Sequence, residues 1–133
     1  MKVCFKGAKK FYSELEINVI KQFVEFINNE IPLTKDVTIH FMGDRTGGMT
    51  TGSRLKSKIK VLVKDRLLID VLRTLVHEWV HEFQHQKLGL KEKTKIQDIG
   101  GPEENMANIL AGIMLKKFQK EFPEFNEVIY SGK

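Results

Sequence analysis

The sequence predicts a single α+β domain, and three observations lead to that prediction. The chain has 133 residues, which suits one compact domain, and 41% of them are hydrophobic, enough to form a core. Apolar residues recur at helical spacing in long segments, and they alternate with polar or basic residues in shorter ones. The segments follow one another roughly as helix, strands, helix, helix, an order typical of an α+β domain.

The N-terminal elements are a short strand and a long helix. Val3–Phe5 reads as the strand. Ser13, followed by a glutamate at position 16, forms the pattern of a capping box, which marks the start of a helix. The helix is expected over about Glu14–Asn29, where the apolar residues at helical spacing are Leu15, Val19, Ile20, Phe23, Val24 and Ile27.

The middle of the chain predicts two strands separated by a loop. Asp36–Met42 alternates and contains β-branched residues, so it is expected to be a strand. Gly43–Gly52 contains turn glycines and is expected to be a loop. In Lys56–Val63 lysines alternate with less polar residues, which predicts a strand with one apolar and one basic face.

Two further helices complete the predicted fold. One is expected over about Arg66–Leu88, with Gly89 placed to end it. The segment Leu90–Gly101 looks irregular. Pro102 follows two glycines and can open a last helix that runs to about Lys120.

Composition restricts the chemistry available to the chain. Cys4 is the only cysteine, so an internal disulfide and a four-cysteine zinc site are both excluded. The first residues lack the apolar core of a secretory signal, and no apolar run approaches the ~20 residues needed to span a bilayer. We therefore expect a cytoplasmic protein without a membrane partner. The net charge of +5 is compatible with nucleic acid as a partner, but it is more simply explained by the charge that keeps a protein soluble.

Three of the four histidines lie between residues 75 and 85, and two of them form the pattern H-E-x-x-H. His77 and His81 are four residues apart, so on a helix both imidazoles lie on one face and can bind one tetrahedral ion. Glu78, next to the first histidine, reaches the edge of such a site without binding the ion. A carboxylate there can take a proton from a zinc-bound water and pass it to the leaving amine.

The expected third ligand is a glutamate in the first turn of the last helix. Glu104 is favoured over Glu103, because it is followed at helical spacing by small residues that let the two helices approach. Glu103 is more simply explained by the general preference for acidic residues at a helix N-terminus. Asn108, one turn beyond Glu104, is expected to accept the free N–H of a ligand histidine, most simply His77.

HEWVH followed by EENMANILAG resembles the gluzincin group of zincin metallopeptidases, and more closely small metallopeptidase-like proteins encoded by tailed phages and bacteria. The resemblance covers about Lys58–Phe118. It implies a minimal zincin-like fold, in which an edge strand of a twisted sheet lines the cleft above the metal helix, and Lys56–Val63 is the candidate for that strand. The sequence departs from the pattern at Glu82, which is charged where many such peptidases carry a neutral residue.

Together, these observations predict a zinc-dependent metallopeptidase acting on a protein or peptide. Zn²⁺ would be held by His77, His81 and Glu104, and Glu78 would be the general base toward a zinc-activated water. Two alternatives stay open: a DNA-associated protease of the SprT-like group, and a non-catalytic binding module stabilised by its metal. The sequence indicates neither an oligomeric state nor a cleavage specificity.

The remaining histidines are expected to have structural roles. His85 is one turn beyond His81 and ~12 Å along the helix axis from His77, too far for one small ion to bind all three. His40 ends the predicted strand and could stabilise an oxyanion, but a lone strand histidine is more often structural.

Overall fold

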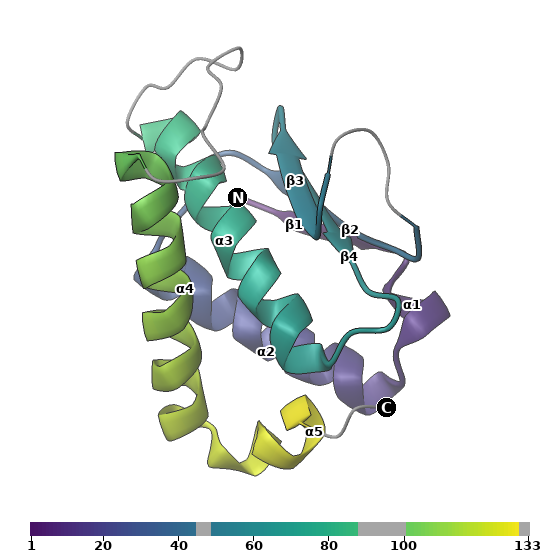
Figure 1. Cartoon of the computed structure of the whole chain (residues 1–133). Helices are drawn as coiled ribbons and strands as arrows, with labels where there is room; N and C mark the ends of the chain where they lie inside the picture. Colours follow the sequence, from purple (N-terminus) through teal and green to yellow (C-terminus); the bar gives the residue numbers. More distant parts are fainter. Residues whose placement is uncertain (45–48, 88–100, 131–133) are drawn as a thin grey trace.

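The computed structural model describes residues 1–44, 49–87 and 101–130, which form a four-stranded sheet packed against helices (Figure 1). The strand order in the sheet is β1-β2-β4-β3. β1, β2 and β4 run parallel to one another, whereas β3 pairs antiparallel with β4 and lies at an edge. The strands are β1 (Val3–Lys6), β2 (Val37–Met42), β3 (Gly52–Leu55) and β4 (Lys58–Leu62).

The prediction of which strand lies at the edge of the sheet was wrong. The predicted strand Lys56–Val63 corresponds to β4, which lies inside the sheet between β2 and β3. The edge strand on that side of the sheet is β3, which begins at Gly52, the last residue of the predicted loop. Lys56 and Ser57 instead form the two-residue turn between the strands, with φ values of 50° and 64°. Such turns normally carry glycine or asparagine, so this hairpin gave no sequence signal.

Three long helices account for most of the remaining described residues: α2 (Glu14–Glu30), α3 (Leu68–Lys87) and α4 (Pro102–Glu121). The capping box of α2 is confirmed, since Glu16 N donates to Ser13 Oγ at 3.2 Å and Ser13 N to Glu16 Oε1 at 2.9 Å. Proline occupies the start of α4, as predicted. Gly89 and residues 90–100, with the predictions made for them, lie outside the described residues. Three short helical segments were not predicted: α1 (Ala8–Phe11), η1 (Pro123–Phe125) and α5 (Asn126–Tyr130).

The core lies between the sheet and the helices. Alternate residues of β2 and β4 face it, including Ile39 and Ile59, which are fully buried. α3 packs against β3 and β4 on one side, and α4 runs beside it in the opposite direction (Figure 1). The close approach of α3 and α4 depends on Ala107 and Ala111, both buried. Among the described helices, none is long and apolar enough to cross a membrane.

Candidate metal centre

α3 and α4 bring the side chains of His77, His81 and Glu104 together in the half-buried seam between them. His77 Nε2 lies 2.7 Å from Glu104 Oε1, and His81 Nε2 lies 3.2 Å from Glu104 Oε2. The two histidine Nε2 atoms are 3.2 Å apart. One ligand atom from each residue lies within 4.8 Å of the others, so the group could hold a metal ion.

The spacing of these atoms fits a small tetrahedral ion. Nitrogen or oxygen ligands about 2.0–2.1 Å from a tetrahedral zinc ion lie ~3.3 Å from one another. The Nε2–Nε2 distance and one of the two Nε2–carboxylate distances are both 3.2 Å. Two imidazoles and one carboxylate are also the ligand types typical of zinc.

Gln84 fixes the orientation of the His81 ring. The hydrogen bonds of the fully buried Gln84 amide define its direction: Nε2 donates to the backbone carbonyl of Glu103 at 2.9 Å and to Met106 Sδ at 3.5 Å, so Oε1 faces His81 Nδ1 at 2.8 Å. His81 Nδ1 therefore donates to Gln84, so in the neutral form of the ring the lone pair lies on Nε2, the atom that faces the other two side chains. Gln84 was not predicted from the sequence; its only signal was a position three residues after the second histidine, on the same face of the helix.

His77 is held in a setting that favours its neutral form. Burial lowers the pKa of its imidazole, and this effect outweighs the nearby charge of Glu104, which acts in the opposite direction. His81 lowers the pKa further, whereas a hydrogen bond from the ring to the side chain of Asn108 raises it. A neutral imidazole is the form that binds a metal ion.

Glu78 lies beside this group and close to the edge strand. Only 8% of the residue is exposed. A Cβ atom added to Gly52 would lie 3.2 Å from Glu78 Cγ and 2.5 Å from Thr74 Cγ2, so only a glycine lets β3 approach α3 this closely. The side chain of Glu78 therefore lies where α3 faces the edge strand β3.

The other candidate residues lie outside the group. Glu103 is half-buried and contributes its backbone carbonyl rather than its carboxylate to the surroundings of the site. His85 is half-buried at the end of α3, and His40 is half-buried on β2. Neither belongs to the clustered ligand atoms found among the described residues.

Glu82, the residue that departed from the family pattern, has a clear structural partner. It is 1% exposed, and its Oε1 accepts hydrogen bonds from Arg54 Nη2 at 2.7 Å and Nε at 2.9 Å. Its Oε2 accepts from Ser57 Oγ at 2.9 Å and from Gln86 Nε2 at 2.5 Å. Glu82 thus ties α3 to the edge strand and its turn, a role that the sequence did not reveal.

Comparison of the chain with protein-family models, with curated proteins and with solved structures found no match. The geometry of the site and the H-E-x-x-H pattern are therefore what indicate a function for the chain.

Proposed function

We propose that the chain is a zinc-dependent peptidase of the gluzincin type, with His77, His81 and Glu104 as the metal ligands. The single observation that supports this most is the convergence of their three ligand atoms, from two helices, within 4.8 Å. Glu104 Oε1 and Oε2 each face one of the two imidazole Nε2 atoms. A buried carboxylate held against two imidazoles favours a cation at their centre, because both rings can then remain neutral ligands.

Glu78 supplies the acid–base chemistry in this proposal. It follows the first histidine directly, lies outside the group of ligand atoms, and is buried beside the edge strand. A zinc ion at this site would lower the pKa of a bound water and polarise a substrate carbonyl. Glu78 would accept the proton of the attacking water and deliver it to the leaving amine.

The edge strand favours a peptide as substrate. β3 pairs with β4 on one side only, and the described residues place no strand on its other side. Its first residue, Gly52, lies against Glu78. An extended peptide could add to this edge by backbone hydrogen bonds and bring a peptide bond to the site. Phage or bacterial origin remains part of the proposal through the sequence resemblance alone. A cytoplasmic location remains part of it through the single cysteine and the lack of an apolar signal core.

Metal analysis tests the ligand set first. We expect about one zinc per chain in the purified protein. His77→Ala, His81→Ala and Glu104→Ala should each lose most of the metal and lower the melting temperature, since the ion would join α3 to α4. Glu103→Ala is the matched control, because its carboxylate is not in the group, and it should retain zinc. Zinc retention by Glu104→Ala would contradict the proposal.

Glu78→Gln separates catalysis from metal binding. This variant should keep its zinc and its melting temperature but lose hydrolysis of a labelled unfolded protein such as casein. Equal cleavage by wild type and Glu78→Gln would exclude the assigned role of Glu78. Zinc binding without any cleavage, across a broad peptide library, would favour the metal-stabilised binding module instead.

A further inference from the structure

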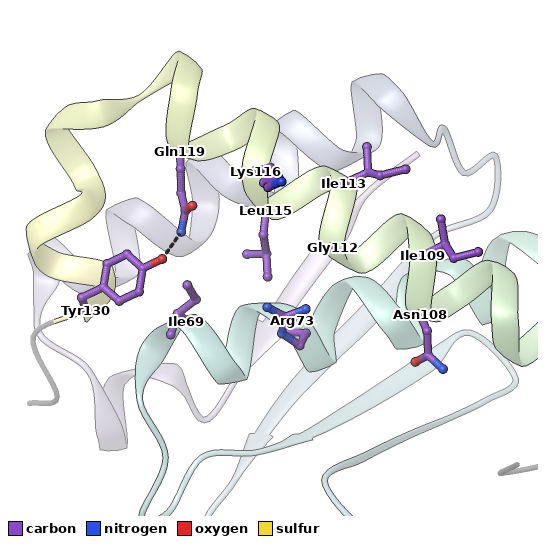
Figure 2. A pocket seen from close by; sticks show the side chains of 10 residues that line it. All are labelled: Ile69, Arg73, Asn108, Ile109, Gly112, Ile113, Leu115, Lys116, Gln119 and Tyr130. Atoms are coloured by element: carbon purple, nitrogen blue, oxygen red, sulfur yellow. Dashed lines mark hydrogen bonds between the residues drawn. The ribbon is translucent and has the colours of Figure 1, made fainter.

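A groove runs along the outer seam of α3, α4 and α5, next to the metal centre (Figure 2). Its volume is about 560 Å³. The side chains that line it come from all three helices: Ile69, Arg73, Asn108, Ile109, Gly112, Ile113, Leu115, Lys116, Gln119 and Tyr130. At one end, Gln119 Nε2 donates to the Tyr130 hydroxyl at 2.7 Å, which links α4 to α5 across the groove (Figure 2).

The other end of the groove meets the candidate metal centre. Asn108 lines the groove and also hydrogen-bonds to the imidazole of His77. Ile69, Arg73 and His77 follow one another at four-residue spacing, so they lie on one face of α3. A molecule seated in the groove would therefore lie beside the ligand histidine.

The groove carries an unusual share of exposed apolar surface. Ile109 is 61% exposed, Ile113 44% and Tyr130 54%. These three are among only eight large hydrophobic side chains that are exposed in the described part of the chain. Leu115, which is buried, also lines it. Apolar residues gathered in a hollow indicate a binding surface more than scattered ones do.

Two cations in the groove lack partners. Arg73 from α3 and Lys116 from α4 make no hydrogen bond or ion pair with residues 1–44, 49–87 or 101–130, and no acidic residue is among the lining side chains. Lys117, next to Lys116, differs in this respect, because its Nζ lies 2.7 Å from Glu30 Oε1. The groove thus combines aliphatic walls with uncompensated positive charge, which suits an acidic and partly apolar ligand.

We propose that the groove docks an acidic amphipathic helix of a protein partner. The walls are side chains of helices and present no strand edge, so an extended segment would find few partners for its backbone, whereas a helix satisfies its own. Asn108 and Gln119 lie about three turns apart on α4, or ~16 Å, which matches a short docked helix. Leucine-type side chains of the partner would face Ile109 and Ile113, and its carboxylates would face Arg73 and Lys116.

This docking does not need the catalytic chemistry proposed above, so the two proposals can fail separately. The probe is a fluorescein-labelled, end-capped peptide of about 14 residues, with leucines on one helical face and glutamates on the other. Its binding is followed by fluorescence anisotropy with Glu78→Gln, which cannot cleave it in the proposed mechanism. A scrambled peptide of the same composition, and one with lysines in place of glutamates, should bind at least about tenfold more weakly.

Variants then locate the binding. Arg73→Glu with Lys116→Glu should weaken binding about tenfold or more. Lys21→Glu with Lys120→Glu is the matched control: it changes the net charge equally with exposed lysines outside the groove, and it should bind nearly as tightly as wild type. Gly112→Leu tests whether the peptide occupies the groove, without any change of charge. A Cβ there meets nothing within 4 Å, so the new side chain would fill the groove and should weaken peptide binding.

Three results would overturn the proposal. If the scrambled peptide binds as tightly as the amphipathic one, net charge alone would explain the binding. An equal loss of peptide affinity in the two double charge variants would mean that the peptide binds outside the groove. No binding of the peptide, together with binding of anionic phospholipid vesicles that Arg73→Glu with Lys116→Glu abolishes, would make the surface a membrane contact instead.

Discussion

Arg54 and Glu82 form a buried ion pair that joins the edge strand to the helix carrying the two candidate ligand histidines. Their side chains are 5% and 1% exposed, and Arg54 Nη2 lies 2.7 Å from Glu82 Oε1. The pair lies on the same strand and helix as Gly52 and Glu78, which face each other across the same interface. The ion pair therefore helps to set the distance between the edge of the sheet and the candidate general base.

Removing one partner of this pair should be strongly destabilising. Glu82→Leu leaves the Arg54 charge buried without its carboxylate, and we expect a loss of about 3–5 kcal/mol in the free energy of unfolding. Urea denaturation measures it. The exposed pair between Lys117 and Glu30 is the control, because Lys117→Ala breaks a contact of the same 2.7 Å length in solvent and should cost much less.

The double variant Arg54→Met with Glu82→Leu tests the cause of that loss. If the cost comes from taking the Glu82 carboxylate away from the buried Arg54 charge, replacing both groups by apolar side chains should recover most of the stability. Failure to recover would mean that the hydrogen bonds of Ser57 and Gln86 to Glu82 contribute more than the charge pair itself.

Gln84 should control metal affinity through His81. Gln84→Leu removes the acceptor of the His81 Nδ1 proton, and we expect zinc to bind 10–100-fold more weakly. Gln84→Glu keeps an acceptor but loses the donor to the Glu103 carbonyl, so its affinity should fall between those of wild type and Gln84→Leu. Competition with a chromogenic zinc chelator measures the zinc affinity of each of the three proteins. Equal affinity of wild type and Gln84→Leu would show that the hydrogen bond does not orient the ring.

The parts of the fold that the sequence predicted are those whose signals are local. The capping box at Ser13, the proline at position 102 and the apolar spacing of the long helices each depend on a few neighbouring residues. The edge strand was missed because it is four residues long and begins at a glycine. Its hairpin turn is formed by Lys56 and Ser57 with positive φ, a conformation that neither residue type predicts.

The candidate site shows the same division. The spacing of His77 and His81 on one helix, and of Glu104 ahead of small residues on another, predicts the group of side chains that the fold brings together. Gln84 and the pair of Arg54 with Glu82 could not be predicted, because each depends on which distant residue packs against α3. A buried glutamate or glutamine in a helix does not reveal its partner in the sequence.

Gly52 should tolerate no side chain. An alanine Cβ at this position would lie 2.5 Å from Thr74 Cγ2 and 3.0 Å from the Lys60 carbonyl oxygen, so we expect Gly52→Ala to lose about 1–3 kcal/mol of stability. Gly112→Ala is the matched control in open space, and it should gain about 0.5–1 kcal/mol because alanine favours a helix. Thermal and urea unfolding of both variants compare them directly.

A second substitution identifies the clash. Thr74→Ser removes Cγ2 but keeps the hydroxyl that accepts a hydrogen bond from Arg66 Nη2 at 2.8 Å. Combined with Gly52→Ala, it should restore part of the lost stability. If the double variant is no more stable than Gly52→Ala alone, the contacts with the Lys60 carbonyl and Glu78 Cγ limit the position instead.

Tyr12 should make the fold sensitive to alkaline pH. Its hydroxyl is buried without a hydrogen-bond partner among the described residues, while its ring packs edge-on against Phe41 at 6.0 Å. Burial raises the pKa of the Tyr12 hydroxyl, and the charge of Glu16 raises it further against the opposing effect of Arg66. In the unfolded chain the hydroxyl ionises near its ordinary pKa of ~10, so its ionisation leaves the stability of the fold unchanged below that pH and lowers it progressively above that pH.

Tyr12→Phe removes this group while keeping the ring. At pH near 8 the variant should be as stable as wild type or up to about 1 kcal/mol more stable, because no hydrogen bond is lost and one buried hydroxyl is removed. Between about pH 9 and 11 wild type should lose stability more steeply than Tyr12→Phe in urea unfolding. Tyr130→Phe, which alters an exposed tyrosine on α5, keeps Tyr12 and should lose stability as steeply as wild type. Parallel pH profiles for wild type and Tyr12→Phe would mean that the Tyr12 hydroxyl finds a partner, such as water, in solution.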